Sequence, residues 1–502
     1  MMAMAQSNFV SNENSIALEA LHRQMNDLRA DIAAHAQDLL QGLCGSAVVP
    51  LQHRPAIENL CHYLSLRHRD LRVLQRELMW RGLSSLGRLE SRVLPTLDAV
   101  SAALSGLQGV ASHLDGLSES KFFAGERSLR AATEDLFGPA RSSRRGRIMV
   151  TMPSEAADQP DFVLDLAKRG MDIARINCAH DDEKAWTMIS GHVRAASEIT
   201  GHKLTVLMDI AGPKIRTEAV AGEKRKLQVG DRLRLVAQGK PRPTQEVEFA
   251  ATVSVAEIVT RVAVGHRVRY DDGKLEGVVE ETGPNEAVIR VTHTKTGGVK
   301  LKPEKGLNLP DTALGLSPLT TKDYSDLATV MTHADMLGYS FVSHADDIDL
   351  LEDALAKFPA RLQPLGLIAK IEQPQAVTNL PELIVRARCR NRPFGVMIAR
   401  GDLAAEIGFE RVAEMQEELL WLCEAAAVPT IWATQVLEDL VKTGLPSRGE
   451  MTDAAMAARA ECVMLNKGPA VGEAVSLLDS LLARMDGHVF KKTPTLRALK
   501  SW

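Results

Sequence analysis

Charged and polar side chains follow several apolar runs of this sequence, at the points where buried strands would end. Arg175 and Asn177 close the run "MDIARIN", and Lys370 and Glu372 close the run "LGLIAKIE". Side chains alternate along a strand, so both members of each pair point to the same side. This spacing would gather cations and a carboxylate at one edge of a sheet.

Other apolar runs end in similar groups. "FGVMIAR" leads into Gly401 and Asp402 at the start of a helical segment, "PTIWAT" ends at Thr434, and "LMDIAGPKIRTE" places Lys214 and Arg216 behind a buried run. Carboxylates among cations suit a divalent metal ion that bridges to an anionic, oxygen-rich substrate, while lysine and arginine hold a phosphate. Backbone N–H groups at the start of the helix could bind a substrate carboxylate.

Each of these features alone has a plainer structural explanation. Lys370 and Glu372 could form a salt bridge at the rim of a sheet, Asp402 could cap a helix, and the Thr434 hydroxyl could bond to backbone. Their coincidence at the ends of successive strands favours a functional site.

Eight short β-rich runs alternate with amphipathic helical segments after the basic linker "RSSRRGR". The runs are "RIMVTM", "MDIARIN", "KLTVLMD", "DMLGYSFV", "LGLIAKIE", "FGVMIAR", "PTIWAT" and "CVMLNK". Eight strands, most of them followed by a helix, predict a (β/α)8 barrel, whose strand ends and loops on one face form the active site. Residues 145–216 and 317–490 are therefore predicted to be the two parts of the barrel.

Residues 217–316, between the third and fourth runs, differ from the barrel segments in composition and in their turn signals. They are rich in Val, Gly and charged residues, with turn signals such as "YDDGKLE" and "TKTGGVK". This pattern predicts a small β-barrel domain inserted after the third strand, where it would cover the site as a lid.

The region before the barrel is predicted to be all helical. Within residues 1–140, apolar side chains recur at helical spacing from Leu18 to Ile32, and a second amphipathic stretch runs from Ala56 to Leu83. The remaining residues, 491–502, are interpreted as a tail.

Composition excludes several classes of protein. The 502 residues are 45% hydrophobic and 25% charged, as in ordinary soluble proteins, and 60 Lys and Arg against 64 Asp and Glu leave no basic footprint for nucleic acid or a membrane. The six cysteines are scattered, which is typical of reduced thiols. With neither a secretion signal nor a long apolar stretch, we expect a cytoplasmic protein.

The order of these motifs resembles the pyruvate kinase family. The resemblance covers residues 145–482 and rests on "RRGRIMVTM", "GMDIARINCAH", "DIAGPKIRT", "KGLNLP", "LIAKIE", "VMIARGDLAAEI", "IWATQVLEDL", "PSRGEMTDAA" and "CVMLN". It implies a glycolytic kinase that transfers phosphate from phosphoenolpyruvate to ADP with Mg²⁺, or alternatively Mn²⁺. Phosphoenolpyruvate and ADP or ATP are the implied partners. A homo-oligomer is compatible with the helical extension.

The resemblance also implies roles for the residues at the strand ends. Lys370 would stabilise charge on the transferring phosphoryl group and the developing enolate. Glu372 and Asp402 would hold the metal, Arg175 would bind the phosphate, and Thr434 would lie near the carbon that is protonated.

Further positions correspond to the substrate, nucleotide and cation sites of the family. The implied substrate wall is Gly401, Asp402, Ser340 and Phe341, the nucleotide side is Arg216, His180, Lys322 and Asn177, and the monovalent-cation region is Asn177, Asp209 and Lys214.

Several positions depart from the family pattern. Ala179 replaces the serine that would bind potassium, and Lys214 stands where potassium-dependent members carry glutamate. We therefore expect that K⁺ is not required. The loop Asn466-Lys467-Gly468-Pro469 is also altered, and the family's C-terminal allosteric domain is not expected in this chain.

Two other functions remain open. A lyase or decarboxylase acting on a 2-keto acid could use the same metal and Lys370 to stabilise an enolate without ADP. A non-catalytic metabolite sensor would account for the altered loop and the helical extension.

Overall fold

A closed barrel of eight parallel strands forms the centre of the molecule. The computed structural model describes residues 2–45, 47–110 and 118–496. The strands are ordered β1-β15-β14-β13-β12-β11-β3-β2 around the barrel. They comprise β1 (Arg147–Thr151), β2 (Ile173–Asn177), β3 (Thr205–Asp209), β11 (Met336–Tyr339), β12 (Gly366–Ile371), β13 (Phe394–Ala399), β14 (Thr430–Ala433) and β15 (Cys462–Leu465). Each predicted run forms one strand, so the predicted barrel is confirmed.

Helices surround the barrel between successive strands. They are α7 (Pro160–Arg169), α8 (Glu183–Thr200), α10 (Thr321–His333), α11 (Ala345–Leu355), α12 (Pro374–Thr378), α13 (Leu380–Cys389), α14 (Arg400–Ile407), α15 (Phe409–Ala425), α16 (Glu438–Thr443), α17 (Arg448–Ala457) and α18 (Val471–Met485). None of the helices in the described ranges is long and apolar enough to cross a membrane.

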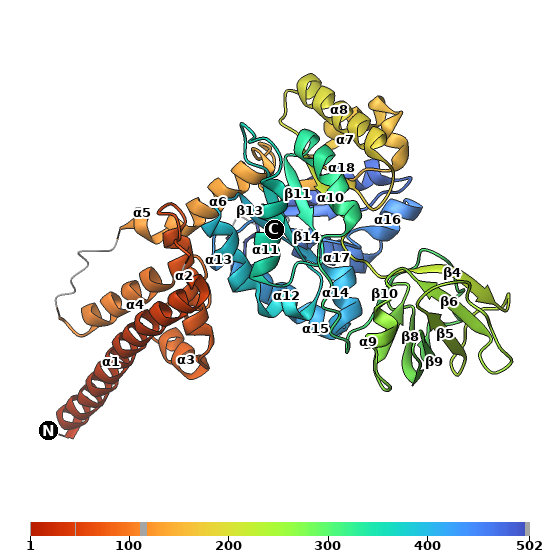
Figure 1. The fold of residues 1–502 in the computed structure, drawn as a ribbon. Helices are drawn as coiled ribbons and strands as arrows, with labels where there is room; N and C mark the ends of the chain where they lie inside the picture. Colours follow the sequence, from red (N-terminus) through yellow and green to blue (C-terminus); the bar gives the residue numbers. More distant parts are fainter. Residues whose placement is uncertain (1, 46, 111–117, 497–502) are drawn as a thin grey trace.

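The lid is a seven-stranded sheet between β3 and β11. Its order is β10-β7-β8-β9-β5-β6-β4. The elements are β4 (Thr217–Gly222), β5 (Arg232–Val236), β6 (Phe249–Val253), α9 (Ile258–Arg261), β7 (Arg267–Tyr270), β8 (Leu275–Thr282), β9 (Glu286–Thr294) and β10 (Leu307–Asn308). The sheet has its own apolar core, which includes Phe249, Tyr270 and Ile289. Figure 1 shows the lid in green, beside the barrel.

Within the described residues before the barrel lie six helices: α1 (Met2–Cys44), α2 (Arg54–Arg67), α3 (Arg72–Trp80), α4 (Val93–Leu107), α5 (Glu119–Phe122) and α6 (Ala124–Phe137). The amphipathic region expected from Ala56 to Leu83 contains two helices, α2 and α3. The carboxylate of Asp70 accepts a hydrogen bond from the Arg72 backbone N–H at 3.1 Å, and this turn chemistry interrupts the helix. In Figure 1 these helices and the lid lie on different sides of the barrel.

The end of α6 closes the bottom of the barrel. Leu136 and Phe137 join the apolar cluster of the barrel interior, with Met149, Ile368 and other inward-facing side chains. Two strands make room for this plug by beginning near glycine, since a Cβ at Gly366 or Gly395 would lie 2.6 Å from Leu136.

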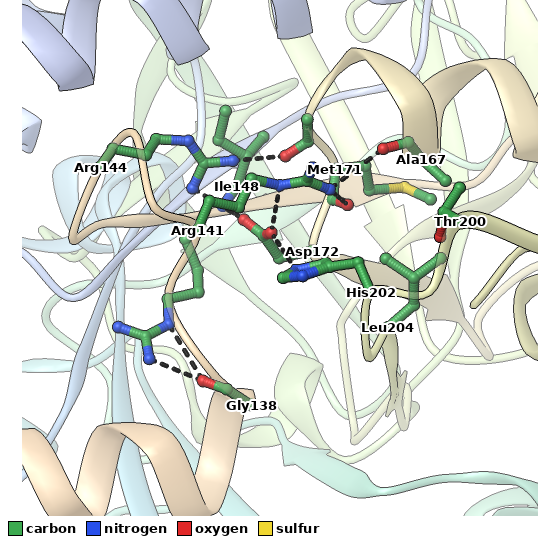
Figure 2. Close-up of polar contacts among 12 residues, drawn as sticks. Gly138, Arg141, Arg144, Ile148, Ala167, Met171, Asp172, Thr200, His202 and Leu204 are labelled. Carbon is green, nitrogen blue, oxygen red and sulfur yellow. Dashed lines mark hydrogen bonds and ion pairs between the residues drawn. The ribbon is translucent and has the colours of Figure 1, made fainter. Parts of the chain in front are cut away.

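The basic linker after α6 is fixed to the barrel base by one buried carboxylate. Asp172, which is 1% exposed, precedes β2. Its oxygens lie 2.9 Å from Arg141 Nε, 2.8 Å from Arg144 Nη1 and 2.9 Å from His202 Nε2, as Figure 2 shows. It also accepts a hydrogen bond from the Ile148 N–H at 2.8 Å, which ties the linker to the first strand.

The segment interpreted as a tail begins in a short hairpin. Strands β16 (Val489–Phe490) and β17 (Thr493–Pro494) pair antiparallel. Lys492 Nζ forms an ion pair with Glu90 of the N-terminal region, and Lys491 Nζ forms one with Glu461. Residues 497–502 of the predicted tail lie outside the described residues.

Candidate active site

The C-terminal rim of the barrel brings the predicted strand-end residues together. Parallel strands end at the same face, so side chains far apart in the sequence meet there. Arg175 and Asn177 lie on β2, opposite Leu207 and Asp209 of β3. The rim and the first turn of α14 also carry Ser340, Phe341, Lys370, Glu372, Gly401, Asp402 and Thr434.

Lys370 is at the centre of the charged network. Its Nζ lies 2.7 Å from Ser340 Oγ, 2.9 Å from Glu372 Oε1 and 3.3 Å from Asp209 Oδ1. Burial alone would lower the pKa of Lys370, but Asp209 and Glu372 raise it above its usual value. The ammonium therefore stays charged although its side chain is only 11% exposed.

Asp209 fixes a second cation beside Lys370. Arg175 Nε lies 2.9 Å from Asp209 Oδ2, and Arg175 Nη1 donates to Thr151 Oγ1 at 3.0 Å. Burial alone would raise the pKa of Asp209, yet Lys370 and Arg175 lower it. The carboxylate remains ionised and fixes the direction of the guanidinium.

Two carboxylates of the rim suit a divalent metal ion. Glu372 accepts the Phe341 N–H at 2.8 Å. Burial raises the pKa of Glu372, Lys370 opposes the shift, and the nearby charge of Asp402 adds to it. Among the residues that the structure describes, no group of three or more His, Cys, Asp or Glu side chains is arranged for a metal. Two hard oxygen ligands fit Mg²⁺, which commonly takes its remaining ligands from water and substrate phosphate.

Asp402 has a lysine partner that the sequence did not indicate. Lys214 Nζ lies 2.8 Å from Asp402 Oδ1. Burial alone would raise the pKa of Asp402, but Lys214 lowers it. With this pair, three cations (Arg175, Lys370 and Lys214) balance three carboxylates (Asp209, Glu372 and Asp402).

The start of α14 is fixed by the loop after β14. The Gly401 N–H donates to Thr434 Oγ1 at 2.7 Å. Arg400 donates to the backbone oxygens of Ala433 at 3.0 Å and Thr434 at 2.8 Å, and Nη2 lies 2.8 Å from Asp453 Oδ2. Sequence reasoning assigned no role to Arg400 or Asp453, although both lie within motifs it had singled out.

Strained backbone gathers around the same rim. Phe341 has φ 59° and Thr434 has φ 65°, followed by Gln435 at φ 56°. Side chains other than glycine occupy this left-handed region at an energetic cost, and such residues cluster at functional sites. In these backbone conformations the Phe341 N–H donates to Glu372, and the Thr434 hydroxyl accepts from the Gly401 N–H.

The nucleotide-side residues predicted by resemblance lie around the loop after β2. Burial lowers the pKa of His180, and the positive charges of Lys467 and Arg216 lower it further. Arg216 Nη1 donates to the Glu304 carbonyl of the lid at 3.1 Å. Lys322 Nζ donates to the Cys178 carbonyl at 2.8 Å. Lys467, from the altered loop, is therefore a cation of this side that the prediction did not include.

The predicted monovalent-cation region is divided. The side chain of Asn177 accepts the Ala179 N–H at 3.1 Å. Asp209 is engaged with Arg175 and Lys370, whereas Lys214 pairs with Asp402. The structure thus brings Lys214 to a predicted metal ligand, and independence of K⁺ stays a prediction.

Comparisons with known proteins agree on one family. A family model described as "Pyruvate kinase, barrel domain" matches residues 143–475. A pyruvate kinase of Mycobacterium intracellulare is 30% identical over 334 residues, covering 66% of this chain and 67% of the relative. One of Methylorubrum extorquens is 32% identical over 336 residues, covering 66% of each protein. The crystal structure of a pyruvate kinase from Cryptosporidium parvum matches with a TM-score of 0.61 and 25% identity, over 71% of this chain and 73% of that one.

Proposed function

We propose, since this chain belongs to the pyruvate kinase family, that it transfers the phosphoryl group of phosphoenolpyruvate to ADP and yields pyruvate and ATP. The observation that carries the proposal is the buried Lys370 ammonium, held between Asp209 and Glu372 at 3.3 and 2.9 Å. A fixed cation in a dry pocket stabilises the charge that develops during phosphoryl transfer. The reaction belongs to glycolysis, and we expect the enzyme to act in the cytoplasm.

The cations of the rim would bind the substrate phosphate. Arg175 is oriented by Asp209 and Thr151, so its guanidinium loses little freedom when it binds. Lys370 would face both the transferring group and the enolate oxygen. As these anions enter, they would take over contacts that Asp209 and Glu372 now make with Lys370.

Glu372 and Asp402 would hold Mg²⁺ or Mn²⁺, which when bound would neutralise charge on the substrate oxygens. The first N–H groups of α14, at Gly401 and Asp402, would receive the substrate carboxylate at the positive end of the helix. Thr434 Oγ1 accepts from Gly401 N at 2.7 Å and would bring its hydroxyl next to the enolate carbon.

Turnover in a coupled assay tests the reaction directly. Pyruvate formation from phosphoenolpyruvate and ADP should require Mg²⁺, and Lys370→Met should lower kcat by about a hundredfold or more, because one preorganised cation is removed. Lys168→Met is a matched control on the exposed side of α7. Absence of pyruvate with a folded protein and Mg²⁺ present would refute the proposal.

ADP binding separates the alternatives. The positive charges of Arg216 and Lys467 around His180 support a nucleotide site. Calorimetry should therefore detect ADP binding. An enolate-forming lyase would turn over a 2-keto acid without binding ADP, and a metabolite sensor would bind ligands without producing pyruvate.

A further inference from the structure

Two strands of the lid make polar side-chain contacts with α14 of the barrel. Arg269 Nη1 on β7 donates to the carbonyl oxygens of Ala405 at 2.8 Å and Ala404 at 3.3 Å. Asn308 Nδ2 on β10 donates to Glu406 Oε1 at 2.8 Å. Further hydrogen bonds join the lid to Ile215 and Arg216, in the segment that leads from β3 into the lid. Figure 1 shows the lid reaching the barrel beside α14.

The two lid residues form one patch on the edge of the sheet. Asn308 lies directly opposite Arg269 in the antiparallel pair of β10 and β7. Arg269 is also fixed from its own side, since Glu276 Oε2 lies 2.9 Å from its Nε. Its guanidinium meets carbonyls in the last turn of α14, where the helix dipole favours a positive charge.

The helix that the lid contacts is also the helix that carries the metal ligand. Asp402 and Glu406 are four residues apart and lie on the same face of α14. The two carboxylates interact electrostatically, because the charge of Asp402 raises the pKa of Glu406 in addition to burial. Asn308 and Arg269 of the lid lower that pKa. One turn of α14 therefore carries both the lid contact at Glu406 and the predicted metal ligand Asp402.

Lys214 forms a third contact to α14. It belongs to the hinge, the segments 210–216 and 309–316 that connect the lid to the barrel. It lies between β3 and β4, where the Gly212 N–H donates to Asp323 Oδ1 at 3.2 Å. The outgoing and returning strands of the hinge are joined, since the Leu307 N–H donates to the Ile215 carbonyl at 2.9 Å. The lid and the Lys214 segment thus move together.

The segment between β3 and β4 packs against the barrel at Gly212, where a Cβ would lie 2.8 Å from Phe341, and it also borders an open space. A cavity of about 350 Å³ lies between the hinge segments and the loops after β11 and β12, with Leu309, Phe341 and Gln373 among its walls. Arg269 and Asn308 thus hold the lid to α14 outside the segments that connect the lid to the barrel.

We propose that Arg269 and Asn308 are positioning residues that latch the lid onto α14 and hold the Lys214 ammonium against Asp402, so that the lid position controls access of the metal to Asp402. The inference rests on the proposed function for the metal site, but the latch itself does not. Metal binding would displace Lys214 from Asp402, and the lid would adjust through the contacts with α14.

Hydrogen exchange of the full-length, metal-free protein tests the latch. In the Arg269→Ala, Asn308→Ala double variant, amides in the last turn of α14 should exchange about tenfold faster, because three hydrogen bonds to this helix are lost. Arg267→Ala is the matched control: Arg267 lies on the same strand, but it pairs with Asp311 inside the lid at 2.7 Å. Equal exchange of α14 in the double variant and the control would overturn the latch.

Binding of Mn²⁺ to the free protein, followed by electron paramagnetic resonance, tests the coupling without turnover. Lys214→Met should bind Mn²⁺ several-fold more tightly, and the double variant should show a smaller gain in the same direction. Unchanged affinity in both variants would overturn the control of metal access. If the unmodified protein bound no Mn²⁺, the metal site of the proposed function would fail, and the exchange experiment would still decide on the latch.

Discussion

Asp172→Asn tests how the linker is anchored beneath the barrel. The substitution removes one buried charge and keeps the shape of the side chain. Arg144, whose side chain is fully buried, would lose a partner at 2.8 Å but keep Asp479 at 2.7 Å. Breaking a buried ion pair costs about 3–5 kcal/mol. Because Asp479 and backbone carbonyls remain, we expect a loss near the lower end, about 3 kcal/mol.

Urea unfolding measures this loss. The surface variant Asp165→Asn, which removes the i,i+4 partner of Arg169, should unfold like the unmodified protein. A midpoint for Asp172→Asn that matches this control would refute the assignment of Asp172 as the anchor of the linker.

The pH dependence of the difference gives a second check. Burial alone would raise the pKa of Asp172, but His202, Arg144 and the Ile148 N–H together lower it. A carboxylate with a lowered folded-state pKa stabilises the fold above its unfolded pKa of about 3.9, and the contribution disappears as the pH falls through the folded value. The stability gap between the two proteins should therefore be constant near neutral pH and shrink below about pH 4.

Three further substitutions probe the active site. Activity should be the same with KCl or NaCl, because the tethered ammonium of Lys214 supplies charge that K⁺ would otherwise give. For the same reason, Lys214→Glu should lower kcat. Strong activation of the unmodified protein by K⁺ would contradict this. Lys467→Ala should raise the KM for ADP several-fold, because it removes a cation beside His180, and an unchanged ADP titration would argue against it. Asp453→Asn should lower kcat by about tenfold or more, because Arg400 would no longer fix the carbonyl of Thr434. Kinetics like those of the unmodified enzyme would show that the loop after β14 needs no such support.

The barrel could be predicted from the sequence because its strands are buried on both faces. Such strands appear as short continuous apolar runs, and all eight were identified. The pairs Arg175 with Asn177 and Lys370 with Glu372 followed from the alternation of side chains along a strand. These signals depend only on neighbouring residues, so they can be recognised in the sequence alone.

The contacts that escaped prediction join residues far apart in the chain. Lys214 and Asp402 are separated by 188 positions, and no local sequence pattern around either residue indicates that the two form a pair. Arg141 and Arg144 were identified only as part of a basic linker, because their acceptor Asp172 comes later in the chain and its burial depends on the closed barrel. The sequence analysis gave no helix boundaries within the region from Ala56 to Leu83, where the structure separates α2 from α3.

The pairing of the first and last barrel strands constrains how this chain folds as it is synthesised. β1 contacts β15 with Arg147 opposite Cys462, so the cylinder cannot close until β15 has left the ribosome, more than 300 residues after β1. The N-terminal helices and the lid, whose β8 and β9 pair as neighbours, emerge earlier and have apolar contacts of their own. The half-made barrel must therefore wait with exposed strand edges, and shielding those edges is the step at which a chaperone would assist this protein most.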